Sequence, residues 1–167
     1  MIEPLSNYLR RYLNDPVELK AALKSPILLF EPLEPSDDEP SEYRFKTHSG
    51  VGGAPIDPSE PAVILVKKQA SNAFKSRITV GRTTNNDLVL DDGSVSRFHA
   101  WFEEEEEHQW KVADAGSKNG TSLNGRKLTA KKLVLISKDA KLKFGDVNAT
   151  FLLPDSFLSL LKEHAAR

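Results

Sequence analysis

Between residues 62 and 153 the chain is a succession of short apolar or alternating runs separated by turn residues, and this pattern limits the fold more than any other feature. Runs of this length match β-strands and are too short for typical helices. The expected strands cover residues 62–66, 77–80, 88–90, 98–102, 110–113, 121–123, 126–128, 133–136, 140–144 and 147–153. So many short strands, with no long helical pattern between them, predict an all-β fold built as an antiparallel β-sandwich.

Two stretches carry further signs of antiparallel pairing. Asn124-Gly125 separates two of the expected strands and is the strongest short-range signal for a β-hairpin. In residues 140–144, apolar side chains alternate with Lys141 and Lys143, so one face of that strand should be buried and the other exposed to water.

Helices are expected on both sides of the strand-rich region. Leu5, Leu9 and Leu13 recur at the spacing of one helical face, and Asp15-Pro16 then offers an N-cap and a first-turn proline for a second helix. A C-terminal helix is expected from the Pro154-Asp155-Ser156 cap onward. The first two helices form either a partner-binding surface or a segment that docks on the main domain.

Proline marks a boundary between these parts. Seven of the ten prolines fall between residues 26 and 61, which is the composition of a linker. The resulting division is an N-terminal helical segment (1–25), a proline-rich linker (26–61), a β-sandwich domain (62–153) and a C-terminal helix (154–167). Inside the linker, the apolar run at 27–30 fits either a strand or a docking segment.

Composition excludes several classes of function. The net charge is −1, with 23 basic and 24 acidic residues, whereas proteins that bind nucleic acid usually present a strongly basic face. There is no cysteine for a disulfide or a thiolate metal site, and the four histidines are scattered, so neither a metal nor another cofactor is expected. The N-terminus lacks the regions of a signal peptide and no apolar run approaches about 18 residues, so we expect a soluble, cytoplasmic protein without membrane contacts.

Three short motifs stand where expected strands end. They are Gly81-Arg82, then Ser96-Arg97-Phe98-His99, and then Gly116-Ser117-Lys118-Asn119-Gly120. Each motif alone is a weak signal, but in this order inside a β-rich region they resemble the forkhead-associated (FHA) domain family, whose pattern is Gly-Arg, Ser-x-x-His and a later Asn-Gly. The resemblance covers residues 62–153 and implies an eleven-stranded β-sandwich that binds phosphothreonine peptides through loops at one end.

The residue chemistry suits that ligand. A phosphothreonine carries nearly two negative charges and three acceptor oxygens, so its site needs a forked cation, neutral donors and a group that holds the peptide main chain. By the resemblance, Arg82 pairs with the phosphate, and Ser96 donates its hydroxyl or its backbone N–H. Asn119 hydrogen-bonds the ligand main chain, a task suited to an amide that can donate and accept.

Two further cations belong to the expected phosphopeptide site. Arg97 occupies a position that often approaches the phosphate in the family. Lys118 is a departure, because the family commonly has threonine there. A lysine brings a mobile point charge in place of a short neutral donor, and it points either at the phosphate or into solvent.

Other motif residues are expected to support the loops without touching the ligand. The resemblance gives His99 the role of joining the loops by internal hydrogen bonds. Gly81 and Gly120 are expected to shape the backbone where a side chain would obstruct. The run Glu103 to Glu107 is expected at the far end of the sandwich, either as a solvated hairpin tip or as a second surface for a basic partner.

The function that follows is that of a phosphothreonine-peptide-binding signalling adaptor, which recognises proteins phosphorylated by Ser/Thr protein kinases. The alternative is a protein-interaction scaffold that uses the same sandwich without phosphate. A hydrolase built on Ser96, His99 and Asp114 is disfavoured, because the nucleophile elbow is missing and the chain is not expected to be an enzyme.

Self-association is a further expectation, through the terminal helices or through a phosphorylated Thr47. Thr47 is preceded by Arg44, the spacing that many basic-directed kinases prefer. About fifteen residues separate it from the sandwich, which gives a reach of roughly 20 Å. A linker threonine that is never modified is the plainer interpretation.

Overall fold

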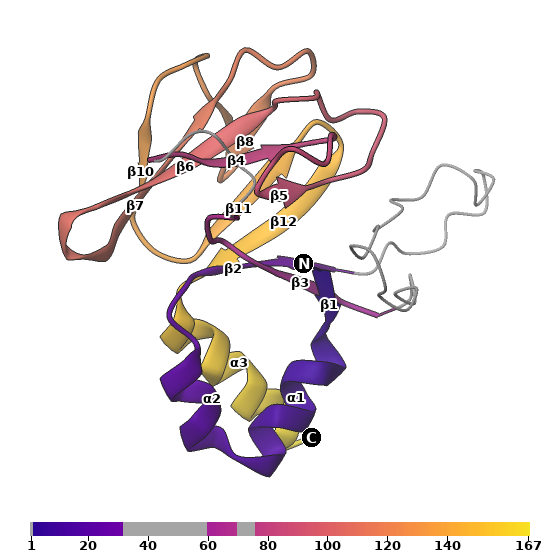
Figure 1. The fold of residues 1–167 in the computed structure, drawn as a ribbon, viewed down its shortest axis with the longest axis vertical. Helices are drawn as coiled ribbons and strands as arrows, with labels where there is room; N and C mark the ends of the chain where they lie inside the picture. Colours follow the sequence, from indigo (N-terminus) through magenta and orange to yellow (C-terminus); the bar gives the residue numbers. More distant parts are fainter. Residues whose placement is uncertain (1, 32–59, 70–75) are drawn as a thin grey trace.

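The computed structural model describes residues 2–31, 60–69 and 76–167, and Thr47 lies outside these residues. Within them the chain forms two β-sheets that face each other and three helices (Figure 1). The larger sheet contains, in spatial order, β1 (Ile2–Pro4), β3 (Ala62–Leu65), β2 (Ile27–Phe30), β12 (Val147–Leu152), β11 (Ala140–Phe144), β8 (Thr121–Leu123) and β9 (Arg126–Lys127). The smaller sheet contains β10 (Val134–Ile136), β7 (Gln109–Asp114), β6 (Ala100–Glu105), β4 (Ile78–Gly81) and β5 (Leu88–Val89).

The predicted all-β sandwich is confirmed. Its described strands pair antiparallel with one exception, since β4 and β5 run parallel. The core between the sheets contains Phe102 from the smaller sheet, which stacks on Phe151 at 5.8 Å between ring centroids and lies edge-on to Phe144 at 6.4 Å. All three rings are fully buried, and burial of each stabilises the sandwich by about 2–3 kcal/mol.

The apolar run at 27–30, for which the sequence allowed either a strand or a docking segment, forms strand β2. It lies between β3 and β12, and its four residues Ile27–Phe30 are all buried. One face of β2 packs on the sandwich core and the other on the helices, which explains a continuous apolar run in place of an alternating one. With β1 also in place, the larger sheet extends beyond the predicted range 62–153 on its N-terminal side.

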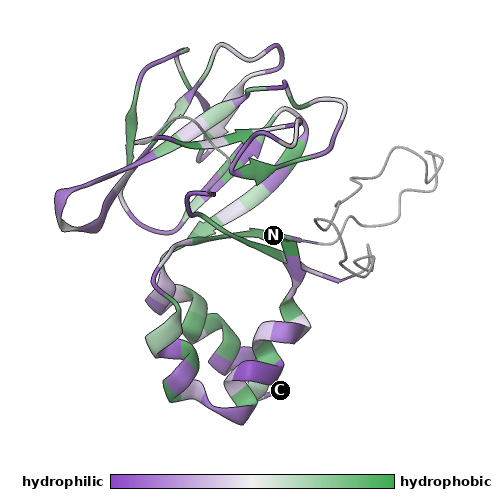
Figure 2. Ribbon diagram, viewed as in Figure 1, coloured by the Kyte–Doolittle hydropathy of each residue, from purple (hydrophilic) through white to green (hydrophobic). Residues whose placement is uncertain are grey.

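The helices α1 (Leu5–Asn14), α2 (Pro16–Ala22) and α3 (Pro154–Ala165) cover the outer face of β2, β3 and β12 (Figure 1). Their apolar sides turn toward one another and toward the sheet (Figure 2). Tyr8 of α1 meets Phe157 of α3 edge to face at 5.3 Å. The N-terminal helices therefore dock on the main domain, although Leu13 and Val17 stay 67% and 77% exposed.

The predicted N-cap is present in α2 but not in α3. Asp15 caps α2, and its carboxylate accepts hydrogen bonds from the N–H groups of Val17 and Glu18. Helix α3 begins at Pro154 with Leu153 in the N-cap position, so the expected cap by Asp155 and Ser156 is not formed. Proline at the first helical position fixes the backbone there, and Asp155 then lies in the first turn, where a negative charge is favourable.

Candidate phosphopeptide site

Hydrogen bonds bring three loops together at one end of the sandwich. The N–H of Arg82, after β4, donates to the carbonyl oxygen of Ser96 at 2.9 Å. The N–H of Lys118, in the loop after β7, donates to the Ser96 hydroxyl oxygen at 3.0 Å. The side-chain amide of Asn119 donates to the carbonyl oxygen of Ser94 at 2.8 Å. Four of the predicted site residues therefore lie in contacting loops.

Three cationic residues belong to these loops. Arg82 is half-buried, whereas Arg97 and Lys118 are exposed. In the part of the chain that the structure describes, none of the three forms an ion pair with a carboxylate. Their charges are therefore not cancelled by direct partners and can act on an incoming anion.

The sequence allowed either the hydroxyl or the backbone N–H of Ser96 as a donor to phosphate, and the structure distinguishes between them. The backbone N–H of Ser96 donates to Nδ1 of His99 at 2.9 Å, so it is already used. The hydroxyl oxygen accepts from Lys118, which leaves the hydroxyl hydrogen available to an acceptor. The hydroxyl is thus the donor that Ser96 can offer to a phosphate.

His99 joins two of the loops from inside the sandwich and is fully buried. Since its Nδ1 accepts from Ser96, the ring proton is on Nε2, which donates to the carbonyl oxygen of Gly120 at 2.9 Å. Burial lowers the pKa of His99, and the hydrogen bond to Gly120 and the negative charge of Asp114 oppose that shift only in part. The neutral ring is therefore the form that holds both loops.

Glycine is required at two points of this end of the molecule. A β-carbon on Gly81 would lie 2.1 Å from the carbonyl oxygen of Arg97, a distance that atoms cannot reach. Gly145, in the turn between β11 and β12, has φ +59°, and a β-carbon there would lie 2.4 Å from the Ser94 carbonyl oxygen. Gly120 also adopts a left-handed conformation, with φ +84°.

Sequence reasoning considered Asp114 only as a hydrolase residue and missed that its carboxylate shapes the Asn119 loop. Asp114, at the end of β7, accepts hydrogen bonds from the hydroxyls of Ser117 and Thr121 and from the N–H groups of Gly116 and Ser117. Burial acts to raise the pKa of Asp114, but these hydrogen bonds outweigh it and the pKa is lowered. The signal was present, because Asp followed by Gly and Ser at a strand end is typical of a side-chain-stabilised turn.

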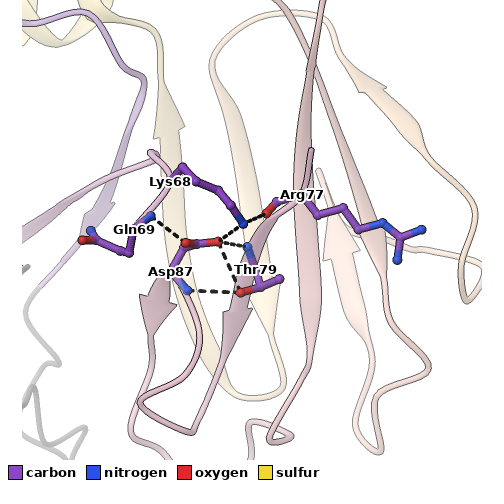
Figure 3. Close-up of polar contacts among 5 residues, drawn as sticks. All are labelled: Lys68, Gln69, Arg77, Thr79 and Asp87. Atoms are coloured by element: carbon purple, nitrogen blue, oxygen red, sulfur yellow. Dashed lines mark hydrogen bonds and ion pairs between the residues drawn. The ribbon is translucent and has the colours of Figure 1, made fainter. Parts of the chain in front are cut away.

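A second buried carboxylate, Asp87, lies at the end of the loop between β4 and β5, which begins with Arg82. It accepts hydrogen bonds from the N–H of Gln69 at 2.7 Å and from the N–H of Thr79 at 2.8 Å. Nζ of Lys68 lies 3.3 Å from Oδ2 of Asp87 and donates a hydrogen bond of 2.6 Å to the carbonyl oxygen of Arg77. The loop is thereby tied both to β4 and to the segment that follows β3 (Figure 3).

The three residues considered for hydrolysis do not form a catalytic arrangement. His99 contacts the backbone N–H of Ser96, not its hydroxyl, and its other nitrogen binds Gly120. Asp114 binds its own loop and makes no hydrogen bond to His99. The relay from acid to base to nucleophile is therefore absent.

The glutamate run lies at the other end of the β6–β7 hairpin. Ala100 pairs with Asp114 near the loops, and Glu105 pairs with Gln109 at the far tip. The rise of a strand makes that separation about 17 Å. The glutamates are partly within β6 and partly in the short helical turn Glu106–His108, so they occupy more than a hairpin tip.

Other classes of site find no support in the described ranges 2–31, 60–69 and 76–167. No group of three or more His, Cys, Asp or Glu residues is placed to hold a metal ion there. No helix in those ranges is both long and apolar enough to span a bilayer.

One family model and several known proteins resemble parts of this chain. The model of the FHA domain matches residues 78–145. The oxoglutarate dehydrogenase inhibitor of Corynebacterium efficiens is 34% identical over 105 residues, which cover 54% of this chain and 73% of that protein. The glycogen accumulation regulator GarA of Mycobacterium tuberculosis is 37% identical over 83 residues, which cover 47% of this chain and 51% of GarA. The FHA domain of the CT664 protein from Chlamydia trachomatis has a TM-score of 0.49 at 22% identity, covering 77% of this chain and 98% of that one.

Proposed function

Because this chain belongs to the FHA domain family, we propose that it is a non-catalytic adaptor that binds phosphothreonine peptides of proteins phosphorylated by Ser/Thr kinases. One observation carries the proposal. Hydrogen bonds join the loops that carry Arg82, the Ser96 hydroxyl and the Asn119 amide at one end of the sandwich, and the cations of these loops have no carboxylate partner in the described part of the chain. This set of groups matches what a doubly charged phosphate on a peptide requires.

Each residue then has a distinct task. The guanidinium of Arg82 makes the charge-assisted pair with the phosphate, and the Ser96 hydroxyl donates to a phosphate oxygen. Asn119 uses one amide hydrogen internally, on Ser94, and keeps a second hydrogen and its oxygen for the ligand main chain. Arg97 and Lys118 add charge around the phosphate, while Gly81, His99 and Gly120 maintain the loops.

The relatives support a regulatory role. One is named as an inhibitor of oxoglutarate dehydrogenase and another as a regulator of glycogen accumulation, and both names describe regulation. For this chain we propose a partner phosphorylated in the cytoplasm by a Ser/Thr kinase. We also propose that residues 26–31 be grouped with the sandwich domain and not with the linker, since β2 is an inner strand of its larger sheet.

The test is a fluorescence-anisotropy titration with a labelled phosphothreonine peptide and its unphosphorylated form. Truncating one partner of a buried charge pair costs about 2–4 kcal/mol. Arg82→Ala should therefore weaken phosphopeptide binding roughly 30- to 1000-fold. Arg10→Ala, at an exposed position of α1, is the matched control and should bind like the wild type.

Two results would contradict the proposal. A loss below about threefold in Arg82→Ala would separate that residue from the phosphate. Equal affinity of the wild type for the phosphorylated and unphosphorylated peptides would favour the phosphate-independent scaffold instead.

A further inference from the structure

Lys127 lies beside the three loops that carry Arg82, Ser96 and Asn119, here called the phosphopeptide loops, and it belongs to none of the three sequence motifs. A β-carbon on Gly120 would lie 2.8 Å from Cε of Lys127 and 3.5 Å from its Nζ. The end of the Lys127 side chain therefore lies directly over the backbone of Gly120, the neighbour of Asn119. Lys127 belongs to β9, so its charge is supplied by a strand and not by one of the three loops.

A second lysine is in line with it across the sheet. Lys143 of β11 pairs with Ser122 of β8, and Ser122 pairs with Lys127 of β9. Directly paired residues point to the same face, and two strand spacings put the α-carbons of the lysines about 10 Å apart. Both lysines are exposed, and the buried neighbour Phe144 shows that they point away from the core.

Lys143 is also at the binding end of its strand. It stands two residues before Gly145, whose N–H donates to the carbonyl oxygen of Gly120 at 3.0 Å. The N–H of Asp146 in the same turn donates to the Ser94 hydroxyl at 2.8 Å. The two lysines thus extend the phosphopeptide loops sideways onto the face of β8, β9 and β11.

The charges on this face are uncompensated within the described part of the chain, because neither Lys127 nor Lys143 forms an ion pair there. The neutral Asn148 faces Lys143 across the strand pair, and Ser122 separates the two lysines. Asp146 is a nearby carboxylate, in the adjoining turn, and it pairs with neither lysine. An anion approaching from the Asn119 side meets positive charge first.

We propose that Lys127 and Lys143 bind a second anionic group of the phosphopeptide, a carboxylate or a second phosphate, on the part of the peptide that continues past Asn119. This rests on the proposed function, since it needs a peptide held at Arg82 and Asn119. An extended peptide advances about 3.3 Å per residue, so the second anion stands about two to four residues from the phosphothreonine. Lysine suits this task because its flexible point charge accepts either anion without fixed geometry.

The test compares three synthetic phosphothreonine peptides by fluorescence anisotropy. One carries Gln at the flanking positions, one carries Glu there, and one carries a second phosphothreonine. Each is titrated against the wild type, the double variant Lys127→Gln/Lys143→Gln and the control Lys24→Gln, which changes an exposed lysine just after α2. Circular dichroism melting checks that the double variant is folded.

An exposed ion pair changes an equilibrium by up to about fivefold, so two pairs, one on each lysine, change it by up to about twentyfold. The wild type and Lys24→Gln should therefore bind the Glu peptide or the doubly phosphorylated peptide about three- to twentyfold more tightly than the Gln peptide. The double variant should lose this preference and bind the Gln peptide as the wild type does. Added salt should reduce the preference in the wild type, because exposed charges are screened.

The outcomes separate the two proposals. If the wild type binds all three peptides equally, or if the double variant keeps the preference, the lysine pair has no such role while the phosphothreonine site stands. If none of the phosphopeptides binds, the proposed function itself fails. A gain with the second phosphothreonine but not with Glu identifies a doubly phosphorylated partner, and a gain with both identifies an acidic one.

Discussion

Replacing Gly81 by alanine should distort the phosphopeptide loops, because Gly81 is packed against the backbone of Arg97. The added methyl group would come within 2.1 Å of the Arg97 carbonyl oxygen and within 2.6 Å of the Asn86 amide nitrogen. Neither atom can move easily, because Asn86 donates to that same carbonyl oxygen at 2.7 Å. The next residue along, Arg82, is held by its N–H bond to Ser96.

The expected cost has two parts. Forcing extra volume into a packed site costs about 1–3 kcal/mol. Displacing the Arg97 carbonyl also weakens the bond from Asn86, which contributes about 1 kcal/mol. Gly81→Ala should therefore lower the free energy of unfolding by about 2–4 kcal/mol and weaken phosphopeptide binding, measured by urea denaturation and by anisotropy.

Gly93→Ala is the matched control from the same group of loops. A β-carbon at Gly93 has no heavy atom within 4 Å, and its φ is not in the left-handed region. That variant should stay within about 0.5 kcal/mol of the wild type or be slightly more stable. If Gly81→Ala unfolds at the same urea concentration as Gly93→Ala, the close packing of these loops is not what supports the site.

Two buried ionisable groups give further predictions. Because the pKa of His99 is lowered in the folded protein, the unfolded state takes up a proton first as the pH falls. The free energy of unfolding of the wild type should therefore decrease as the pH drops below about 6.5. In His99→Gln, the difference between the urea midpoints at about pH 7.5 and about pH 5.5 should be smaller than in the wild type. An unchanged difference would show that this histidine does not control the pH response. Asp114→Asn should lose about 2–4 kcal/mol at neutral pH, because one amide oxygen cannot accept bonds from all the donors now bound. That loss should diminish as the pH falls below about 3.9, because the unfolded wild type then takes up a proton that the lowered pKa keeps off the folded carboxylate, and this destabilises the wild type but not the variant. A loss independent of pH in denaturation curves would argue against a charged Asp114.

Local signals were sufficient for much of the sandwich. The hairpin at Asn124-Gly125 has positive φ at both residues, 51° and 83°, as a tight turn between twisted strands requires. The strand at 140–144 shows the predicted alternation of buried and exposed residues. These features depend only on neighbours in sequence, which is why the pattern alone could predict them.

Features that depend on distant partners were out of reach. Strand β1 has three residues, one of them Pro4, and it exists because β3 supplies a partner sixty residues further along. The run 27–30 could not be classified until its neighbours β3 and β12 and the covering helices were known. At the site, the motifs indicate which side chains gather, whereas the choice of the Ser96 hydroxyl over its N–H follows only from the position of His99. The roles of all the predicted site residues toward the phosphopeptide stay predictions: Arg82, Ser96, Arg97, Lys118 and Asn119.

The place of β2 in the larger sheet has a consequence for synthesis on the ribosome. Leu29 pairs with Thr150, so one edge of β2 has no partner strand until about 120 further residues have been translated. At about 5–20 residues per second, β2 waits on the order of ten seconds with an apolar, unpaired edge. The nascent protein should therefore need a chaperone to bind this edge during that interval, even though the loops that carry Arg82, Ser96 and Asn119 have been translated earlier.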